Sequence, residues 1–431
     1  MELKLVDLPE PSGLGLACEH LDLPPEGEAW EGYGRYYTGD GTHYALVCPD
    51  CISTFRLSGQ VPRLLPRSDE DLAIIEDELC DDVIGAPAFG KRLSNLAFSD
   101  VHFPCDFEVA AVAHDGLRWL GLSSQGELID LCGNALLCRL DLGSISSDLP
   151  LDLYARSGYV VVVNRLGRCG RAYSQTDGRR VLNLDRGGYR PTVSRFPVAL
   201  VQQNDRCLLI HASSWNQLHI TDLETGKAVN NRQVGDRFDY FHASLSASPG
   251  GEWVISNGWV WHPMGWLRSW SLKDWLDSNP FEAEDGTSVR DLCQRNYYWD
   301  GPTCWLDETT LAVWGHGDDS LWLTPAVLFF DVRSGTQVGW FPGPQIRGGE
   351  LPGATTSPKG QPGPWPGFLA FDKHLFAVSP DDGTTVWDIS TGEQLLHSPA
   401  LKPIASHAGE FLSLGDGSIT LSRLIERTEP T

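Results

Sequence analysis

The chain has 431 residues, of which 41% are hydrophobic and 21% charged, with 45 Gly, 28 Pro and 16 Trp, a composition typical of a compact, turn-rich protein rather than a disordered one. Its formal net charge of −24 would repel a phosphate backbone over most of the surface, which argues against nucleic acid as a partner. The first residues lack the basic start and apolar run of a secretory signal, and no segment approaches about 18 uncharged apolar residues. We therefore expect a cytoplasmic protein that does not enter a membrane.

Residues 1–60 carry the sharpest local signal for a metal site. Cys18 and His20 form a Cys-x-His pair, and Cys48 and Cys51 form a Cys-x-x-Cys pair. Each close pair can supply one corner of a tetrahedral Zn²⁺ site, so we expect a small zinc-binding unit with a structural Zn²⁺. Four protein ligands leave no open position for an activated water. A segment with few large apolar residues also needs such a cross-link to fold.

Other interpretations of these residues stay open. Cys48 and Cys51 could form a redox pair, although the surrounding sequence does not alternate as a βαβ unit. The four residues could also be unrelated to one another, and His43 could replace His20 as a ligand.

Residues 61–94 are expected to form a linker with one short acidic helix over residues 68–82. Ser68 and Asp71 have capping-box spacing, and Leu72, Ile75 and Leu79 recur at helical spacing. We interpret the acidic outward face as solvated, with a basic partner as the alternative.

From about residue 95 a short pattern recurs, in which apolar residues lead to an Asp or Ser and then to a Gly-containing turn. The clearest copies are at Asp222, Asp331 and Asp388, and weaker copies fall at positions 130, 174, 271 and 422. A spacing of about 40–50 residues is typical of propeller blades. The sequence therefore predicts an all-β fold, with a seven-bladed β-propeller over residues 95–431.

Two departures from this spacing have causes in the sequence. The Gly/Pro-rich segment 342–367 is expected to be an inserted loop. The last blade has room for only three strands, so a strand near residues 95–98 is expected to complete it and close the ring.

At these residues, most plainly at Trp387-Asp388, the chain resembles the WD-repeat family. The resemblance extends over the predicted propeller. It implies a scaffold that binds protein partners on its flat faces.

Six Trp residues cluster between Trp253 and Trp275. Among them, Trp259, Trp261 and Trp266 are the candidate partner-binding residues, because Trp is favoured as the anchor of a protein interface. The other interpretation is that these rings are core residues packed between blades.

Enzyme motifs are missing from the sequence, which has no Gly-x-Ser-x-Gly elbow, Walker-type phosphate loop or His-Glu-x-x-His helix. We therefore expect a non-catalytic scaffold for protein–protein interaction. The alternative is an enzyme, such as a hydrolase, lyase or quinoprotein-like protein, acting in the central funnel. Converging His and carboxylate side chains with perturbed pKa values would favour the enzyme, whereas exposed Trp and Arg would favour binding.

Overall fold

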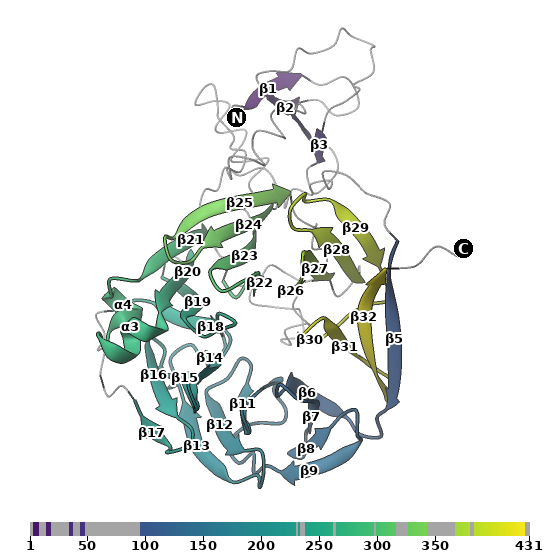
Figure 1. Ribbon diagram of the computed structural model, residues 1–431. Coiled ribbons are helices and arrows are strands. Elements are labelled where there is room, and N and C mark those ends of the chain that lie inside the picture. Colours follow the sequence, from purple (N-terminus) through teal and green to yellow (C-terminus); the bar gives the residue numbers. More distant parts are fainter. Residues whose placement is uncertain are drawn as a thin grey trace.

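The structure is a computed structural model. It describes residues 95–229, 232, 238–261, 264–296, 299–315, 326–342, 367–379 and 383–426, and four short strands nearer the N-terminus. Seven four-stranded antiparallel sheets form a closed ring, which is a seven-bladed β-propeller (Figure 1). The all-β fold predicted from the repeat is therefore confirmed.

The N-terminal strands form a sheet of their own in the order β1-β2-β4-β3. The strands are β1 (Leu3–Asp7), β2 (Leu14–Cys18), β3 (Gly34–Tyr37) and β4 (Tyr44–Val47). The predicted helix over residues 68–82 lies outside the described residues.

The blades follow one another along the chain. Blade 1 contains β6 (Val109–His114), β7 (Trp119–Ser123), β8 (Glu127–Asp130) and β9 (Ala135–Arg139); blade 2 contains β10 (Leu151–Arg156), β11 (Tyr159–Asn164), β12 (Cys169–Ser174) and β13 (Arg180–Asp185). Blade 3 contains β14 (Val198–Gln203), β15 (Arg206–Ser214), β16 (Gln217–Asp222) and β17 (Lys227–Ala228); blade 4 contains β18 (Phe241–Ala247), β19 (Trp253–Val260), β20 (Met264–Ser271) and β21 (Arg290–Asn296). Blade 5 contains β22 (Thr303–Trp305), β23 (Thr310–Gly315), β24 (Ala326–Asp331) and β25 (Thr336–Pro342); blade 6 contains β26 (Gly367–Phe371), β27 (His374–Ser379), β28 (Gly383–Asp388) and β29 (Gln394–Ser398). Blade 7 contains β30 (Ala405–His407), β31 (Glu410–Gly415), β32 (Ser418–Glu426) and β5 (Leu96–Pro104).

Alternating strand direction gives the ring two different faces. The first strands of neighbouring blades, such as β6 and β10, contact each other around the axis. The turns from first to second strand and from third to fourth strand lie at one end of each blade, which we call the lower face. The turns from second to third strand and the connections to the next blade lie at the opposite end, the upper face.

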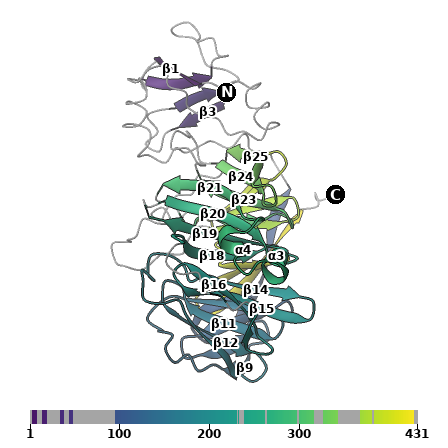
Figure 2. The ribbon, with the colours of Figure 1, turned by 90° about the vertical axis from the view of Figure 1, so that its left-hand side faces the viewer.

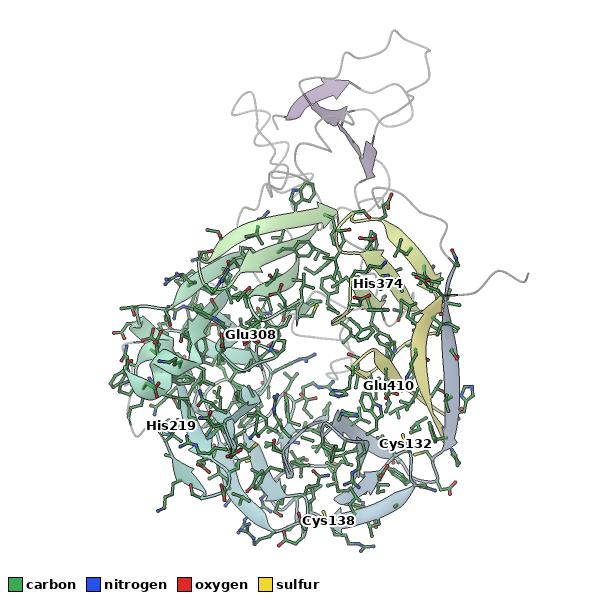
Figure 3. All side chains as sticks on the ribbon, in the orientation of Figure 1. Cys132, Cys138, His219, Glu308, His374 and Glu410 are labelled. Carbon is green, nitrogen blue, oxygen red and sulfur yellow. The ribbon has the colours of Figure 1, made fainter. Side chains whose placement is uncertain are left out.

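The hydrophobic core lies between the blades, whose side chains fill the spaces around the ring (Figure 3). Strand β11 illustrates how an inner strand contributes to this core. Its Val160, Val161, Val162 and Val163 are all 0% exposed. Val160 and Val162 pack toward blade 1, whereas Val161 and Val163 pack toward blade 3. Successive side chains of a strand point to opposite faces, so an inner strand covered by two neighbours is apolar at every position.

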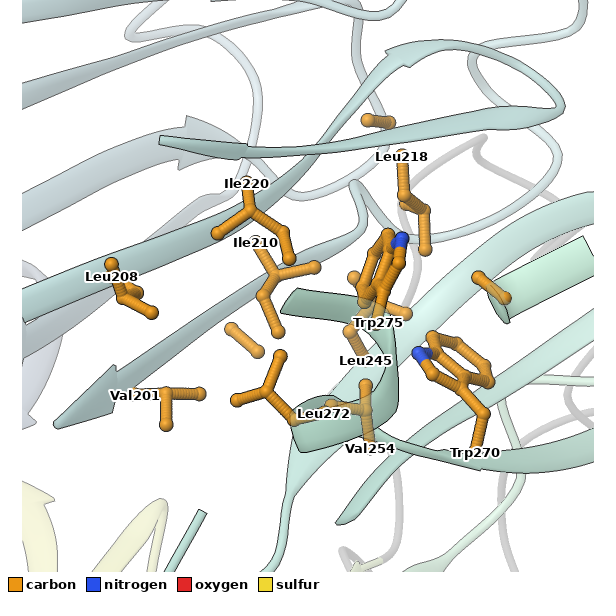
Figure 4. Close-up of a cluster of buried hydrophobic side chains, with 13 residues drawn as sticks. Val201, Leu208, Ile210, Leu218, Ile220, Leu245, Val254, Trp270, Leu272 and Trp275 are labelled. Carbon is orange, nitrogen blue, oxygen red and sulfur yellow. The ribbon is translucent and has the colours of Figure 1, made fainter. Parts of the chain in front are cut away.

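One of these clusters joins blades 3 and 4 (Figure 4). Leu208 and Ile210 of β15 and Ile220 of β16 meet Trp270 of β20 and Trp275, and all five are at most 1% exposed. Burial of apolar area of this kind is the main stabilising contribution to such a ring.

The ring closes with its N-terminal strand, as predicted. Strand β5 pairs antiparallel with β32 from Leu96 opposite Glu426 to Pro104 opposite Ser418. The Phe98 ring contacts the Phe411 ring edge-on at 6.1 Å between centroids. Closure removes the open edges that the first and last blades would otherwise expose.

The repeated Asp marks the turn that leaves the third strand of a blade. Six of the seven predicted repeat positions are the last residue of a third strand: Asp130, Ser174, Asp222, Ser271, Asp331 and Asp388.

The turn after Asp388 shows how the repeat works. The Asp388 carboxylate accepts the backbone N–H groups of Ser390 (2.9 Å) and Thr391 (3.1 Å). The N–H of Gly392 donates to the Asp388 carbonyl at 2.8 Å, and the φ of Gly392 is 66°. Glycine adopts this left-handed conformation without strain, which explains the Asp-to-Gly spacing. The seventh position, Ser422, lies inside β32.

A helical insertion replaces this turn in blade 4. The Ser271 hydroxyl accepts the N–H of Asp274 at 3.1 Å and caps helix α3 (Leu272–Asp277), which is followed by α4 (Glu282–Asp285). Both helices lie on the outer rim of the ring (Figures 1 and 2). Neither they nor any other helix in the described part of the chain is both long and apolar enough to cross a bilayer. The predicted loop between β25 and β26 lies outside the described residues.

Candidate partner-binding site

Six aromatic side chains from neighbouring blades meet on the upper face and form what we call the aromatic platform. Its members are Tyr189, Trp215, Phe241, Trp259, Trp261 and Trp299. Tyr189 lies in the connection from blade 2 to blade 3, and Trp215 lies in the turn between β15 and β16. The others belong to blade 4 and to its connection to blade 5.

Four rings of the platform stack nearly parallel from the interior to the surface. Trp299 stacks on Trp259 with 5.1 Å between centroids, Trp259 stacks on Phe241 at 4.0 Å, and Phe241 stacks on Tyr189 at 5.6 Å. The three inner rings are buried, whereas Tyr189 is 49% exposed. Such ring pairs add about 0.5–1.5 kcal/mol each beyond their area burial, so Tyr189 rests on a stiff support.

The exposed part of the platform combines a Trp with an Arg. Trp261, which is 38% exposed, meets the Trp259 ring edge-on at 5.1 Å. The guanidinium carbon of Arg190 lies 5.3 Å from the centroid of Trp261, in a cation–π contact. Tyr, Trp and Arg are the residue types most enriched at interface hot spots, and here all three are open to solvent.

A buried arginine shapes the loop that presents Tyr189 and Arg190. The Arg186 guanidinium donates to the backbone carbonyls of Gly167 (2.7 Å), Arg195 (2.8 Å) and Ser194 (2.7 Å), and also to that of Pro191. Burial lowers the pKa of Arg186 to about 10, so it remains charged at neutral pH. A loop fixed from inside loses little further entropy when a partner binds.

The same loop is tied to blade 4. The Asp300 carboxylate accepts the backbone N–H of Arg195 at 2.8 Å and the N–H and hydroxyl of Ser244 at 2.8 and 2.7 Å. The Trp299 indole N–H donates to the Val193 carbonyl at 3.0 Å. The platform is therefore assembled across blades before any ligand arrives.

The structure separates the three Trp residues singled out in the sequence. Trp259 and Trp261 meet in the platform, but Trp259 is 2% exposed and supports the surface rather than forming it. Trp266 belongs to a different cluster, in which the Arg268 guanidinium carbon lies 5.7 Å from its ring centroid. Trp259 is therefore a core residue, whereas the Trp261 ring is partly exposed to solvent.

Sequence reasoning missed Tyr189, Trp215, Phe241, Trp299 and Arg186. The segment Arg186-Gly187-Gly188-Tyr189-Arg190 did carry a signal, because an aromatic residue beside two glycines indicates an exposed turn. Nothing local indicated that this turn would meet blade 4.

The predicted zinc ligands fall largely outside the described residues. His20, Cys48 and Cys51 lie there, as does the alternative ligand His43, and Cys18 is described only as the last residue of β2. Strands β2 and β4 run parallel, with Leu16 opposite Ala45 and Ala17 opposite Leu46. Within the described blades, no three His, Cys, Asp or Glu side chains gather in a way that could hold a metal ion.

No protein-family model matches the chain, and no curated protein matches its sequence. Solved structures with a similar fold include BamB from Moraxella catarrhalis, with 12% identity, 74% of this chain and 86% of that chain covered, and a TM-score of 0.45. A computationally designed protein, Ika8, has 12% identity, coverages of 75% and 98%, and a TM-score of 0.44. AztD from Citrobacter koseri has 10% identity, coverages of 74% and 74%, and a TM-score of 0.42. Likeness of this degree assigns neither a family nor a function to the chain.

Proposed function

We propose that the chain is a non-catalytic scaffold whose propeller binds a protein partner through the upper face, with the aromatic platform at the centre of the contact. The observation that carries this proposal is the group of Tyr189, Arg190 and Trp261, exposed side by side above a buried ring stack. Rigid aromatic anchors beside an arginine supply contact area at low entropic cost. A relationship to WD-repeat scaffolds is part of this proposal and is supported by the Asp-capped turns.

An enzyme acting near the axis would need titratable groups that are free to act on a substrate. The innermost strand of blade 2 carries Asp152, which accepts a hydrogen bond from Arg165 at 2.8 Å. Burial raises the pKa of the nearby Tyr154, which therefore stays protonated at neutral pH. Both oxygens of Asp300 are occupied by backbone and hydroxyl donors. These bonds support structural roles, so we favour binding over catalysis.

The N-terminal unit is proposed to hold one structural Zn²⁺ on Cys18, His20, Cys48 and Cys51. Because β2 ends at Cys18 and the parallel strand β4 ends at Val47, the two strands finish at the same edge of their sheet. Cys48 follows Val47 directly in the sequence. This register supports one Cys pair meeting the other.

We also propose a cytoplasmic location and partners other than nucleic acid. The seven cysteines of the described blades form no disulfide with one another, as is usual in a reducing compartment. The net charge of −24 disfavours a phosphate backbone.

Substitution of the exposed rings tests the platform. Full-length wild type, Trp261→Ala and Tyr189→Ala would each be tagged in the native cell, and the co-purifying proteins quantified. Val338→Ala is the matched control, because Val338 is 53% exposed on the outer strand β25, away from the platform. We expect at least one partner to fall about tenfold with either ring substitution and not with the control. Identical sets of co-purifying proteins would overturn the proposal, provided that the melting temperatures are unchanged.

A further inference from the structure

We propose that a groove on the lower face, between blades 1 and 2, binds an extended peptide segment carrying an apolar side chain next to Lys or Arg. The groove has a volume of about 640 Å³ and is formed by the β6–β7, β10–β11 and β12–β13 turns together with Leu137 of β9. This volume falls within the range of ligand-binding clefts. Because these turns belong to the lower face, the groove is distinct from the aromatic platform.

One wall of the groove is apolar, and its tip is open to solvent. Leu117, at the tip of the β6–β7 hairpin, is 86% exposed, and the half-buried Leu137 of β9 also lines the groove. An exposed leucine in a concave site gains about 1.5–3 kcal/mol when a partner covers it. Together the two side chains form an apolar contact surface that can accommodate one apolar side chain of a peptide.

The hairpin that carries Leu117 is held in place before binding. The buried Asp115 carboxylate accepts the backbone N–H groups of Leu117 (2.7 Å) and Arg118 (2.9 Å) and the side-chain amide of Gln175 (2.7 Å). Burial opposes ionisation, but these hydrogen bonds outweigh it and hold the pKa of Asp115 below its usual range. The wall is thus rigid and carries a permanent negative charge.

The electrostatics of the groove favour a cation over an anion. The N–H groups of Gly116, Leu117 and Arg118 are all engaged within the hairpin, so it offers no free amide to an anionic ligand. Arg118 lies 3.5 Å from Asp115 and 3.6 Å from Asp130, which already neutralise it.

A further carboxylate adds to this negative field. Asp177 is on the β12–β13 turn beside the groove residue Thr176, and its nearest basic neighbour, Arg179, is 3.9 Å away. Asp115 and Arg118, the two charged residues that line the groove, pair with each other, so a basic segment is attracted by Asp177 beside the groove and by the net charge of −24 of the whole chain. A basic segment would be drawn to this face.

A displayed library of random heptapeptides, selected against the full-length protein, tests the proposal and needs no identified partner. We expect the enriched peptides to combine an apolar residue with Lys or Arg. Their affinity should fall at least tenfold in Leu117→Asp, which disrupts the apolar contact surface. It should also fall in Thr176→Lys, which adds a positive charge at an exposed position of the rim. Val338→Asp on β25 is the matched control and should bind as wild type does.

The outcomes separate this groove from the platform. If the enriched peptides bind Trp261→Ala as tightly as wild type, their site is not the aromatic platform. This result supports the groove even if the proposal for the platform fails. Enrichment of acidic peptides, no enrichment at all, or unchanged binding in Leu117→Asp and Thr176→Lys would overturn the inference. Binding that is lost in Trp261→Ala would also overturn it, because the peptides would then occupy the platform.

Discussion

The imidazole rings of His114 and His407 stack across the seam where blade 7 meets blade 1, with 3.6 Å between centroids and 12° between planes. Beside them, the Trp119 indole N–H donates to the carboxylate of Glu410 at 3.1 Å. Glu410 is labelled in Figure 3. Burial lowers the pKa of His114 and the neighbouring His407 lowers it further, against the opposing effects of Asp115 and Glu410. The Nδ1 atom of His114 accepts the N–H of Gly116 at 3.0 Å, so a proton on that atom would break this bond.

We expect the free energy of unfolding to fall as the pH drops from about 7 to about 4. Burial is the main cause that lowers the pKa of His219, His242 and His374 as well, and it takes the pKa of His211 to about 4. In this range the unfolded chain binds protons on these rings and the folded chain does not, so protons favour unfolding. Thermal melts across the range measure the effect.

A substitution in the seam isolates the contribution of the stacked pair. His407→Gln removes one cause of the lowered pKa of His114, so the loss of stability with falling pH should become shallower. Ser406→Ala, on the same strand, changes no titratable group and should keep the wild-type slope. A melting temperature that stays constant from about pH 7 to pH 5 in the wild type would contradict this account.

Ring closure by β5 predicts a sharp difference between two truncated chains. A chain beginning at residue 95 keeps the full register between β5 and β32 and should fold cooperatively. A chain beginning at residue 105 exposes the edge of β32 and should aggregate or melt at a much lower temperature. Size-exclusion chromatography and thermal melts compare the two, and equal behaviour would mean that β5 does not close the ring.

The turn glycines should resist substitution for conformational reasons alone. Gly226 has a φ of 67°, and a Cβ there would meet no atom closer than 3.9 Å. Gly226→Ala should therefore cost about 1 kcal/mol through backbone strain rather than collision. Gly188→Ala is the matched control, because Gly188 has open space around it and lies outside the left-handed region. Denaturant unfolding that shows equal losses for the two variants would refute the strain explanation.

The insertion in blade 4 depends on a buried ion pair. The Arg232 and Glu284 side chains are 1% and 5% exposed, and they share two hydrogen bonds. Glu284→Ala leaves a buried charge without its partner and should cost about 3–5 kcal/mol. The exposed Lys273–Asp277 pair is the comparison, and Lys273→Ala should cost less than about 0.5 kcal/mol in the same unfolding measurement.

One zinc ion per chain is expected from elemental analysis of protein purified without chelators. Cys51→Ser should lose the metal, because a structural Zn²⁺ site needs all four of its ligands and this substitution removes one thiolate. Cys169→Ser, which changes a half-buried cysteine of blade 2, should keep it. Protein that contains no metal would refute the site.

The sequence by itself determined the propeller, because the signals that encode it are local. In the clearest copies of the repeat an Asp carboxylate accepts backbone N–H groups up to three residues ahead, and a Gly follows four residues after the Asp. Backbone geometry of the turn sets both of these spacings. The closing strand followed from counting strands against the cost of an open edge. The helical insertion after Ser271 also had a local signal in the capping serine and the spacing of Leu272 and Trp275, but the repeat pattern concealed it.

Only the tertiary structure decided which side chains form binding surfaces. Tyr189 and Trp299 are far apart in the sequence, yet they lie at the two ends of one ring stack, joined through Phe241 and Trp259, because two blade connections end on the same face. Leu117 and Thr176 line one groove for the same reason on the opposite face. A strand pattern states that a residue is buried or exposed, but it does not state which neighbouring blade it faces. Which blade a side chain faces is set only when the ring has closed and each turn lies beside the turns of the neighbouring blades.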